Sequence, residues 1–159
     1  NAAFGLMSSH RMGRDEARKK AIDFLKQVGL SEADANRYPS DISAGAQKRV
    51  GLARAIATEP EILFFDEPTT GIDPVMGDII DSLIVSCVRN LGATALTITH
   101  DMESARRIGD RVAMIYEGKI VWVGDVAEID DSGNAFIHQF IHGSVEGPMA
   151  SLIAANASV

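Results

Sequence analysis

The chain has 159 residues, a length typical of one domain, and a domain near this size buries about 70% of its unfolded surface. Its 15 basic and 22 acidic residues give a formal net charge of −7, which argues against a general nucleic-acid-binding surface. No apolar run approaches the roughly 20 residues of a membrane-spanning helix, and the single cysteine, Cys87, excludes an internal disulfide, so we expect a cytoplasmic protein with a buried thiol.

The N-terminal part predicts one amphipathic helix followed by a connection. Residues 1–13 show no clear helical or strand period. Residues 15–28 place their apolar side chains on one helical face, and Gly29 provides a stop. Residues 30–41 are polar and contain a proline, which predicts a connecting segment.

A second helix is predicted after Ser43. This side chain can cap a helix that begins near Ala44, and the small residues there allow backbone amides to approach a ligand closely. Free amides and the helix dipole make such a start a plausible phosphate site. A plain capped helix explains the same residues without a ligand, and this stretch alone leaves both interpretations open.

The most informative stretch is residues 62–68, ILFFDEP, in which four apolar residues run directly into Asp66 and Glu67. A continuous apolar run predicts a strand of a parallel sheet that is buried on both faces. Ligands of such sheets bind beyond the carboxyl ends of the strands, so one carboxylate can serve a magnesium ion and the next can act on a water molecule. The alternative is that the two acids simply end a core strand and face solvent.

The next elements predict a crossover between two parallel strands. Asp73 can cap a helix whose apolar residues recur at spacings of three and four until Gly92. Residues 95–99 form a second short strand-like run, which ends on His100. A right-handed crossover places His100 at the same sheet edge as Glu67. The histidine can be structural or functional at this point.

The C-terminal part looks peripheral. Residues 101–108 predict a short helix, and residues 111–124 a β-hairpin. Residues 135–141 predict another short helix, whose neighbouring His138 and His142 lack a third metal ligand and are interpreted as solvated.

Taken together, these features resemble the nucleotide-binding subunit of ABC transporters. The resemblance is carried by four stretches, which look like the signature motif, Walker B, the D-loop and the switch-histidine loop of that family: ISAGAQKR at residues 42–49, ILFFDEP at 62–68, GIDP at 71–74 and ITH at 98–100. It implies an α/β fold, with a P-loop NTPase-like parallel sheet, flanking helices and the helical subdomain of ABC ATPases.

The same resemblance implies a division of the chain. Residues 1–150 would form a partial ABC ATPase domain and residues 151–159 a tail. Within the domain, residues 1–60 would be the helical subdomain with the signature motif, residues 61–125 the core with the other three motifs, and residues 126–150 the C-terminal helix.

The resemblance also implies roles on the subunit's own nucleotide. Asp66 would hold Mg²⁺, Glu67 would activate or position a water molecule, and His100 would contact the γ-phosphate of ATP. We therefore expect an ATPase.

Further roles would involve a second, identical ATP-binding subunit. Ser43, Ala44 and Gly45 would approach ATP held by that subunit, and Asp73 would communicate between the two sites. The signature motif usually has two adjacent glycines, and Ala44 occupies the first position. Since an alanine at a helix start can keep φ negative, we expect the phosphate cradle to survive.

One family motif is absent. No G-x-x-x-x-G-K-[ST] occurs in the sequence, so the loop and lysine that cradle the β- and γ-phosphates are missing. We expect a domain truncated at its N-terminus, which alone does not hydrolyse ATP.

The stretch FIHGSVEGPM, residues 140–149, resembles the tail of ATPases that serve MCE-type (Mla) lipid transporters. This implies phospholipid transport in the Gram-negative envelope, with a membrane permease and an MCE-type lipid-binding protein as partners and a location at the inner membrane. The alternative is the ATPase of an importer of polar amino acids or other solutes. Soluble ABC ATPases of DNA repair or translation form a further class, expected to carry a long coiled coil or a basic surface, and this chain shows neither.

Overall fold

The computed structural model describes residues 1–150 and divides the chain into two units, Asn1–His100 and Asp101–Val159. The elements of the first unit are, in chain order, α1 (Phe4–Ser9), α2 (Arg14–Gln27), the short 3-10 helices η1 (Asp34–Asn36) and η2 (Pro39–Asp41), α3 (Ala44–Ile56), β1 (Ile62–Asp66), α4 (Pro74–Leu91) and β2 (Thr94–Ile98).

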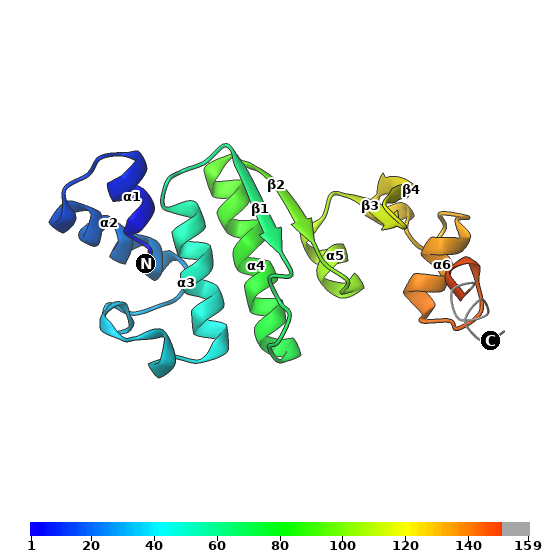
Figure 1. Ribbon diagram of the computed structural model, residues 1–159, viewed down its shortest axis with the longest axis horizontal. Helices are drawn as coiled ribbons and strands as arrows, with labels where there is room; N and C mark the ends of the chain where they lie inside the picture. The colour runs from blue at the N-terminus through cyan, green and yellow to red at the C-terminus, as the bar shows by residue number, and fades with distance from the viewer. Residues whose placement is uncertain (151–159) are drawn as a thin grey trace, which may run out of the picture. The chain divides into compact units, whose positions relative to one another are not determined.

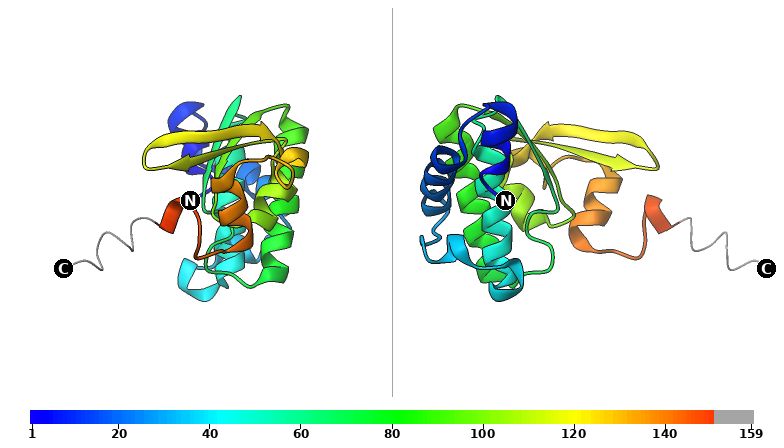
Figure 2. Two further views of the ribbon diagram at one scale, coloured as in Figure 1. Left: turned by 90° about the vertical axis from the view of Figure 1, so that its right-hand side faces the viewer. Right: turned by 60° about the vertical axis from the view of Figure 1, so that its left-hand side comes forward.

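The two strands of the first unit form a parallel pair connected by α4. Leu63 lies opposite Ala95, and Asp66 lies opposite Ile98. Helix α3 packs against α2 and α4. The views of Figures 1 and 2 place α3 and α4 on one side of the two strands. The predicted strand–helix–strand crossover is therefore present, with both carboxyl ends at one sheet edge.

Strand β1 is not buried on both faces, so that prediction is wrong for the described residues. Its side chains alternate, with Leu63 buried and Phe64 73% exposed. Strand β2 shows the same alternation, with Leu96 and Ile98 exposed. A strand is covered on both sides only where elements pack on both faces of its sheet, and helices α3 and α4 lie on one side.

The core of the first unit is formed mainly by its helices. Buried apolar residues on α2, α3 and α4 include Phe24, Ile56 and Ile84. The predicted buried thiol is confirmed, because Cys87 is 6% exposed and burial raises its pKa. Helix α1 was not predicted, because its six residues make too few turns to show a helical period. The fully buried side chain of Leu6 packs this helix into the unit.

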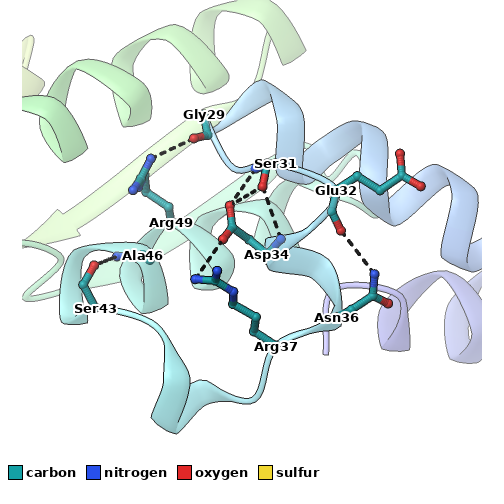
Figure 3. A network of polar contacts seen from close by, with 9 residues as sticks. All are labelled: Gly29, Ser31, Glu32, Asp34, Asn36, Arg37, Ser43, Ala46 and Arg49. Carbon is teal, nitrogen blue, oxygen red and sulfur yellow. Dashed lines mark hydrogen bonds and ion pairs between the residues drawn. The ribbon is translucent and has the colours of Figure 1, made fainter.

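The connection between α2 and α3 is organised by side-chain contacts (Figure 3). Asp34 accepts hydrogen bonds from the backbone N–H and the hydroxyl of Ser31, and these bonds lower the pKa of the Asp34 carboxyl. Arg49 of α3 donates to the Gly29 carbonyl at 3.0 Å, beyond the end of α2. These contacts hold the connection that precedes Ser43, the N-cap residue of α3.

The second unit contains α5 (Met102–Ile108), β3 (Arg111–Tyr116), β4 (Lys119–Asp125), the 3-10 helix η3 (Val126–Glu128), α6 (Ala135–His142) and the 3-10 helix η4 (Pro148–Ala150). Strands β3 and β4 pair antiparallel, as predicted. His138 and His142 are exposed, with stacked rings whose centroids lie 4.2 Å apart. Among residues 1–150, no group of three or more His, Cys, Asp or Glu side chains is arranged to hold a metal ion.

The predicted tail, residues 151–159, lies outside the described residues. Within the part of the chain that the structure describes, none of the helices has both the length and the apolar character that crossing a membrane requires.

Replacement by alanine should have opposite effects on stability at two glycines of the first unit. Gly92 ends α4 at φ +63°, whereas Gly51 lies inside α3, and a Cβ added at either position meets no atom within 4 Å. Gly92→Ala should therefore destabilise the chain by about 1–2 kcal/mol through its left-handed backbone. Gly51→Ala should stabilise it by about 0.5–1 kcal/mol through helix propensity. Urea unfolding of the 159-residue chain measures both, and a change of the same sign at the two positions would contradict these backbone roles.

Candidate functional site

The parallel pairing of β1 with β2 brings Glu67 and His100 together. The Glu67 backbone N–H donates to the Ile98 carbonyl at 2.9 Å, which extends the ladder by one residue beyond β1. Two residues after Ile98, the Nδ1 of His100 lies 2.8 Å from the Oε1 of Glu67. The prediction that both residues occupy one sheet edge is confirmed.

The carboxylate of Glu67 is held at both oxygens. Its Oε2 accepts a hydrogen bond from the Thr70 hydroxyl at 2.7 Å, while Oε1 faces His100. The hydrogen bond with His100, and next that with Thr70, lower the pKa of the Glu67 carboxyl. Glu67 is therefore an ionised group near neutral pH, and since each carboxylate oxygen has two acceptor sites, it can still orient a water molecule.

The backbone of Glu67 adopts a conformation that is uncommon for a residue with a side chain. Its φ is +47°, in the left-handed region. The Glu67 carbonyl accepts hydrogen bonds from the Nζ of Lys48 at 3.1 Å and from the Thr70 backbone N–H at 3.3 Å. Contacts on the N–H, the carbonyl and the carboxylate thus fix this residue in an otherwise costly geometry.

Neither Thr70 nor Lys48 was singled out from the sequence. Thr70 lies three residues after Glu67 in a turn, a spacing at which hydroxyls often make local hydrogen bonds, so its position carried a usable signal. Lys48 is separated from Glu67 by 19 positions, and nothing in the local pattern connects them.

Asp66 fits the predicted role of a magnesium ligand. It ends β1 with an exposed side chain, next to Glu67 at the carboxyl end of the strand pair. Magnesium needs only one or two protein carboxylates, because it keeps water molecules and shares phosphate oxygens of its substrate. A single exposed carboxylate at this edge is therefore sufficient, and the absence of a larger ligand cluster in residues 1–150 does not argue against it.

The start of α3 has the predicted cap. The Oγ of Ser43 accepts a hydrogen bond from the Ala46 N–H at 3.2 Å, and the side chains of Ser43 and Ala44 are exposed. Gly45 is buried instead, and a Cβ at this position would lie 2.7 Å from the Cε of Met76. The small residue at position 45 thus lies directly against α4, and a Cβ there would require the flexible end of the Met76 side chain to move. Contact of these residues with a nucleotide stays a prediction.

Asp73 lies close to this contact and caps α4. Its Oδ1 accepts a hydrogen bond from the Met76 N–H at 3.0 Å, and Pro74 follows as the first helical residue, as predicted. Met76 therefore links the Asp73 cap to Gly45 at the start of α3. Communication between two sites through Asp73 remains a prediction.

Comparison with known proteins finds similarity to ATP-binding proteins of ABC transporters. Residues 2–70 match the family model described as ABC transporter. The chain is 36% identical to Protein TRIGALACTOSYLDIACYLGLYCEROL 3, chloroplastic, of Arabidopsis thaliana, over 94% of this chain and 48% of that protein. It is 40% identical to the glycine betaine/proline betaine transport system ATP-binding protein ProV of Escherichia coli, over 90% of this chain and 36% of that protein. The chain thus spans half or less of the length of these relatives.

A solved structure shares the fold. It is the dimeric structure of a post-hydrolysis state of the ATP-binding cassette MJ0796 bound to ADP and Pi, with a TM-score of 0.69 and 33% identity over 79% of this chain and 54% of that chain. The chain has the α/β fold of ABC ATPases. The family match, the relatives and the shared fold identify it as part of an ABC transporter ATP-binding domain.

Proposed function

We propose that the whole protein binds and hydrolyses ATP to energise a membrane transporter. The observation that carries this proposal is the pairing of Glu67 with His100 at the carboxyl end of β1 and β2, next to the exposed Asp66. Phosphoryl transfer depends mainly on positioning and charge stabilisation, and these residues supply an ionised carboxylate held in a fixed place.

Each residue has one task in this mechanism. Asp66 holds Mg²⁺, which when bound neutralises charge on the phosphates. Glu67 orients the attacking water through its carboxylate; because hydrogen bonds lower its pKa, positioning contributes more than its strength as a base. His100 fixes the Glu67 carboxylate through Nδ1, and we assign its other ring nitrogen to the γ-phosphate.

The nucleotide site is assigned to the interface of two copies. Ser43 and Ala44 are exposed at the start of α3, where backbone N–H groups and the helix dipole favour an anion. We assign them to the ATP bound by the other subunit, and Asp73 to communication between the two sites. The related MJ0796 cassette, a dimer bound to ADP and Pi, supports this arrangement.

The transported substrate is best assigned to the small polar solutes. The ProV relative is named as a betaine transport ATP-binding protein, which supports a solute importer with a membrane permease as partner and a place at the cytoplasmic side of the membrane. Phospholipid transport is the second candidate. It has support from residues 140–149 and from the Arabidopsis relative, whose name is that of a galactolipid, whereas a partnership with an MCE-type protein has no support among the relatives.

One transport experiment distinguishes the two candidate substrate classes. The whole protein is purified with its membrane partner and reconstituted into vesicles, and ATP-dependent movement is measured for radiolabelled glycine betaine and amino acids and for a fluorescent phospholipid. Uptake of a solute without lipid movement supports the first candidate, and the reverse result supports the second.

Removing the carboxylate of Glu67 tests the mechanism. In the whole protein, Glu67→Gln should lower ATP turnover by about 100- to 10,000-fold, because the positioned carboxylate is lost, while ATP binding is retained in a dimer. Phosphate release and nucleotide binding measure the two effects. Glu61→Gln, an exposed acid just before β1, is the matched control and should behave like the unchanged protein. Undiminished turnover in Glu67→Gln would remove Glu67 from the mechanism.

The titration of Glu67 should depend on its two hydrogen-bond partners. Its pKa is below 4.5 in the folded protein, so Glu67 stays ionised at neutral pH and is protonated only as the pH falls through that lowered pKa. His100→Ala should raise the pKa toward 4.5, and Thr70→Val should raise it by less, because the His100 bond is the larger cause. Carbon-13 NMR of the Glu67 carboxyl measures each value. A pKa above 4.5 in the unchanged protein would contradict the hydrogen-bonded geometry.

A mixed dimer separates the two kinds of site residue. Ser43→Arg on one subunit and Glu67→Gln on the other should put both changes in one composite site, because Ser43 acts on the partner's nucleotide. The same two changes on one subunit should damage both sites. A bulky cation obstructs close approach of helix amides to phosphate, so nucleotide occupancy per dimer should differ between the arrangements. Equal occupancy would favour a plain capped helix at α3.

A further inference from the structure

Lys48 extends from α3 to the turn that follows β1. Its Nζ donates a hydrogen bond to the backbone carbonyl of Glu67 at 3.1 Å. The lysine is half buried, so its stem is held while its end reaches the carbonyl. The contact joins the helix that begins with the Ser43 cap to the residue that carries the candidate catalytic carboxylate.

The backbone of Glu67 needs external support. At φ +47° it occupies the left-handed region, which residues with a Cβ adopt only when surrounding contacts compensate. The Ile98 carbonyl holds the Glu67 N–H, and the Thr70 N–H provides a longer bond of 3.3 Å to the Glu67 carbonyl. Among these contacts, only the one from Lys48 comes from α3.

We propose that Lys48 is a positioning residue, which holds the Glu67 backbone in its left-handed conformation and thereby places the carboxylate for ATP hydrolysis. This inference rests on the proposed function of Glu67. It adds that the position of the carboxylate depends on α3, the same helix whose start is assigned to the nucleotide of the partner subunit.

The contact acts through geometry. Lys48 bonds to the carbonyl of Glu67, whereas the carboxylate is held by His100 and Thr70. Loss of the Lys48 donor leaves those two side chains in place but removes the shorter of the two hydrogen bonds to the Glu67 carbonyl, so the backbone that carries the carboxylate is held less firmly. A displacement of about 1 Å at a reacting group can lower a rate by about 100-fold.

The test is a set of lysine variants in the whole protein. Lys48→Met keeps an apolar stem but removes the donor, and it should lower kcat for ATP by about 10- to 100-fold, with KM changed less than about twofold. Lys48→Arg retains a donor and should recover most of the turnover. Lys19→Met, on the exposed side of α2, makes the same change in charge and is the matched control.

A double variant separates positioning from an independent effect. Because Lys48 acts through Glu67, adding Lys48→Met to Glu67→Gln should cause little further loss of turnover. Additive losses would overturn the proposal. So would a Lys48→Met protein that matches Lys19→Met in kcat, or one that changes only KM.

A second measurement does not require turnover. Once the Lys48 contact is lost, the Glu67 backbone should leave its left-handed φ of +47° more often, so the HN–Hα coupling constant of Glu67, which reports φ, should change in Lys48→Met and stay unchanged in Lys19→Met. Solution NMR records both values, and an unchanged Glu67 coupling constant in Lys48→Met would overturn the inference. If the unchanged protein fails to hydrolyse ATP, the proposed function is contradicted. The NMR result is independent of turnover and still decides whether Lys48 holds the Glu67 backbone.

Discussion

The parallel pairing of β1 with β2 is the constraint on which the candidate site depends. In a parallel pair both strands point the same way, so the residues after Asp66 and after Ile98 arrive at one edge. The bond from the Glu67 N–H to the Ile98 carbonyl carries this pairing one step beyond β1. Contact between Glu67 and His100, which lie 33 positions apart, then follows from the register of the strands.

At this edge the geometry of Glu67 has a cost that other contacts offset. A left-handed backbone is unfavourable for glutamate, by about 1–2 kcal/mol, and each single hydrogen bond contributes a net amount of similar size. Because the residue is held at its N–H, its carbonyl and both carboxylate oxygens, the conformation is stable without a glycine. A glycine would adopt the turn more easily but would supply no carboxylate, so the role proposed for Glu67 in ATP hydrolysis would account for a glutamate where the backbone favours glycine.

Much of the first unit could be predicted because local rules decide it. The Ser43 and Asp73 caps, the Gly92 stop and the crossover between the strands all follow from short patterns. The contact of Lys48 with Glu67 could not be predicted, because it depends on how α3 packs beside the strand. The exposed face of β1 was also missed. The apolar run around Phe64 shows that the strand is hydrophobic, but it does not show on which faces of the strand other elements pack.

Gly45 shows why the role of a small residue needs a structure. From the sequence, a glycine at a helix start suggests close approach of a ligand to backbone amides. In the structure, Gly45 is buried against Met76, and a Cβ would come within 2.7 Å of that side chain. A substitution at Gly45 would therefore require the end of the Met76 side chain to move, whether or not a nucleotide binds nearby. Ser43 is exposed, so enlarging its side chain moves nothing on α4, and the change within the unit is the loss of the cap hydrogen bond from the Ala46 N–H. Ser43→Ala, which loses the same cap without adding bulk, therefore separates an effect on nucleotide contact from an effect on the helix.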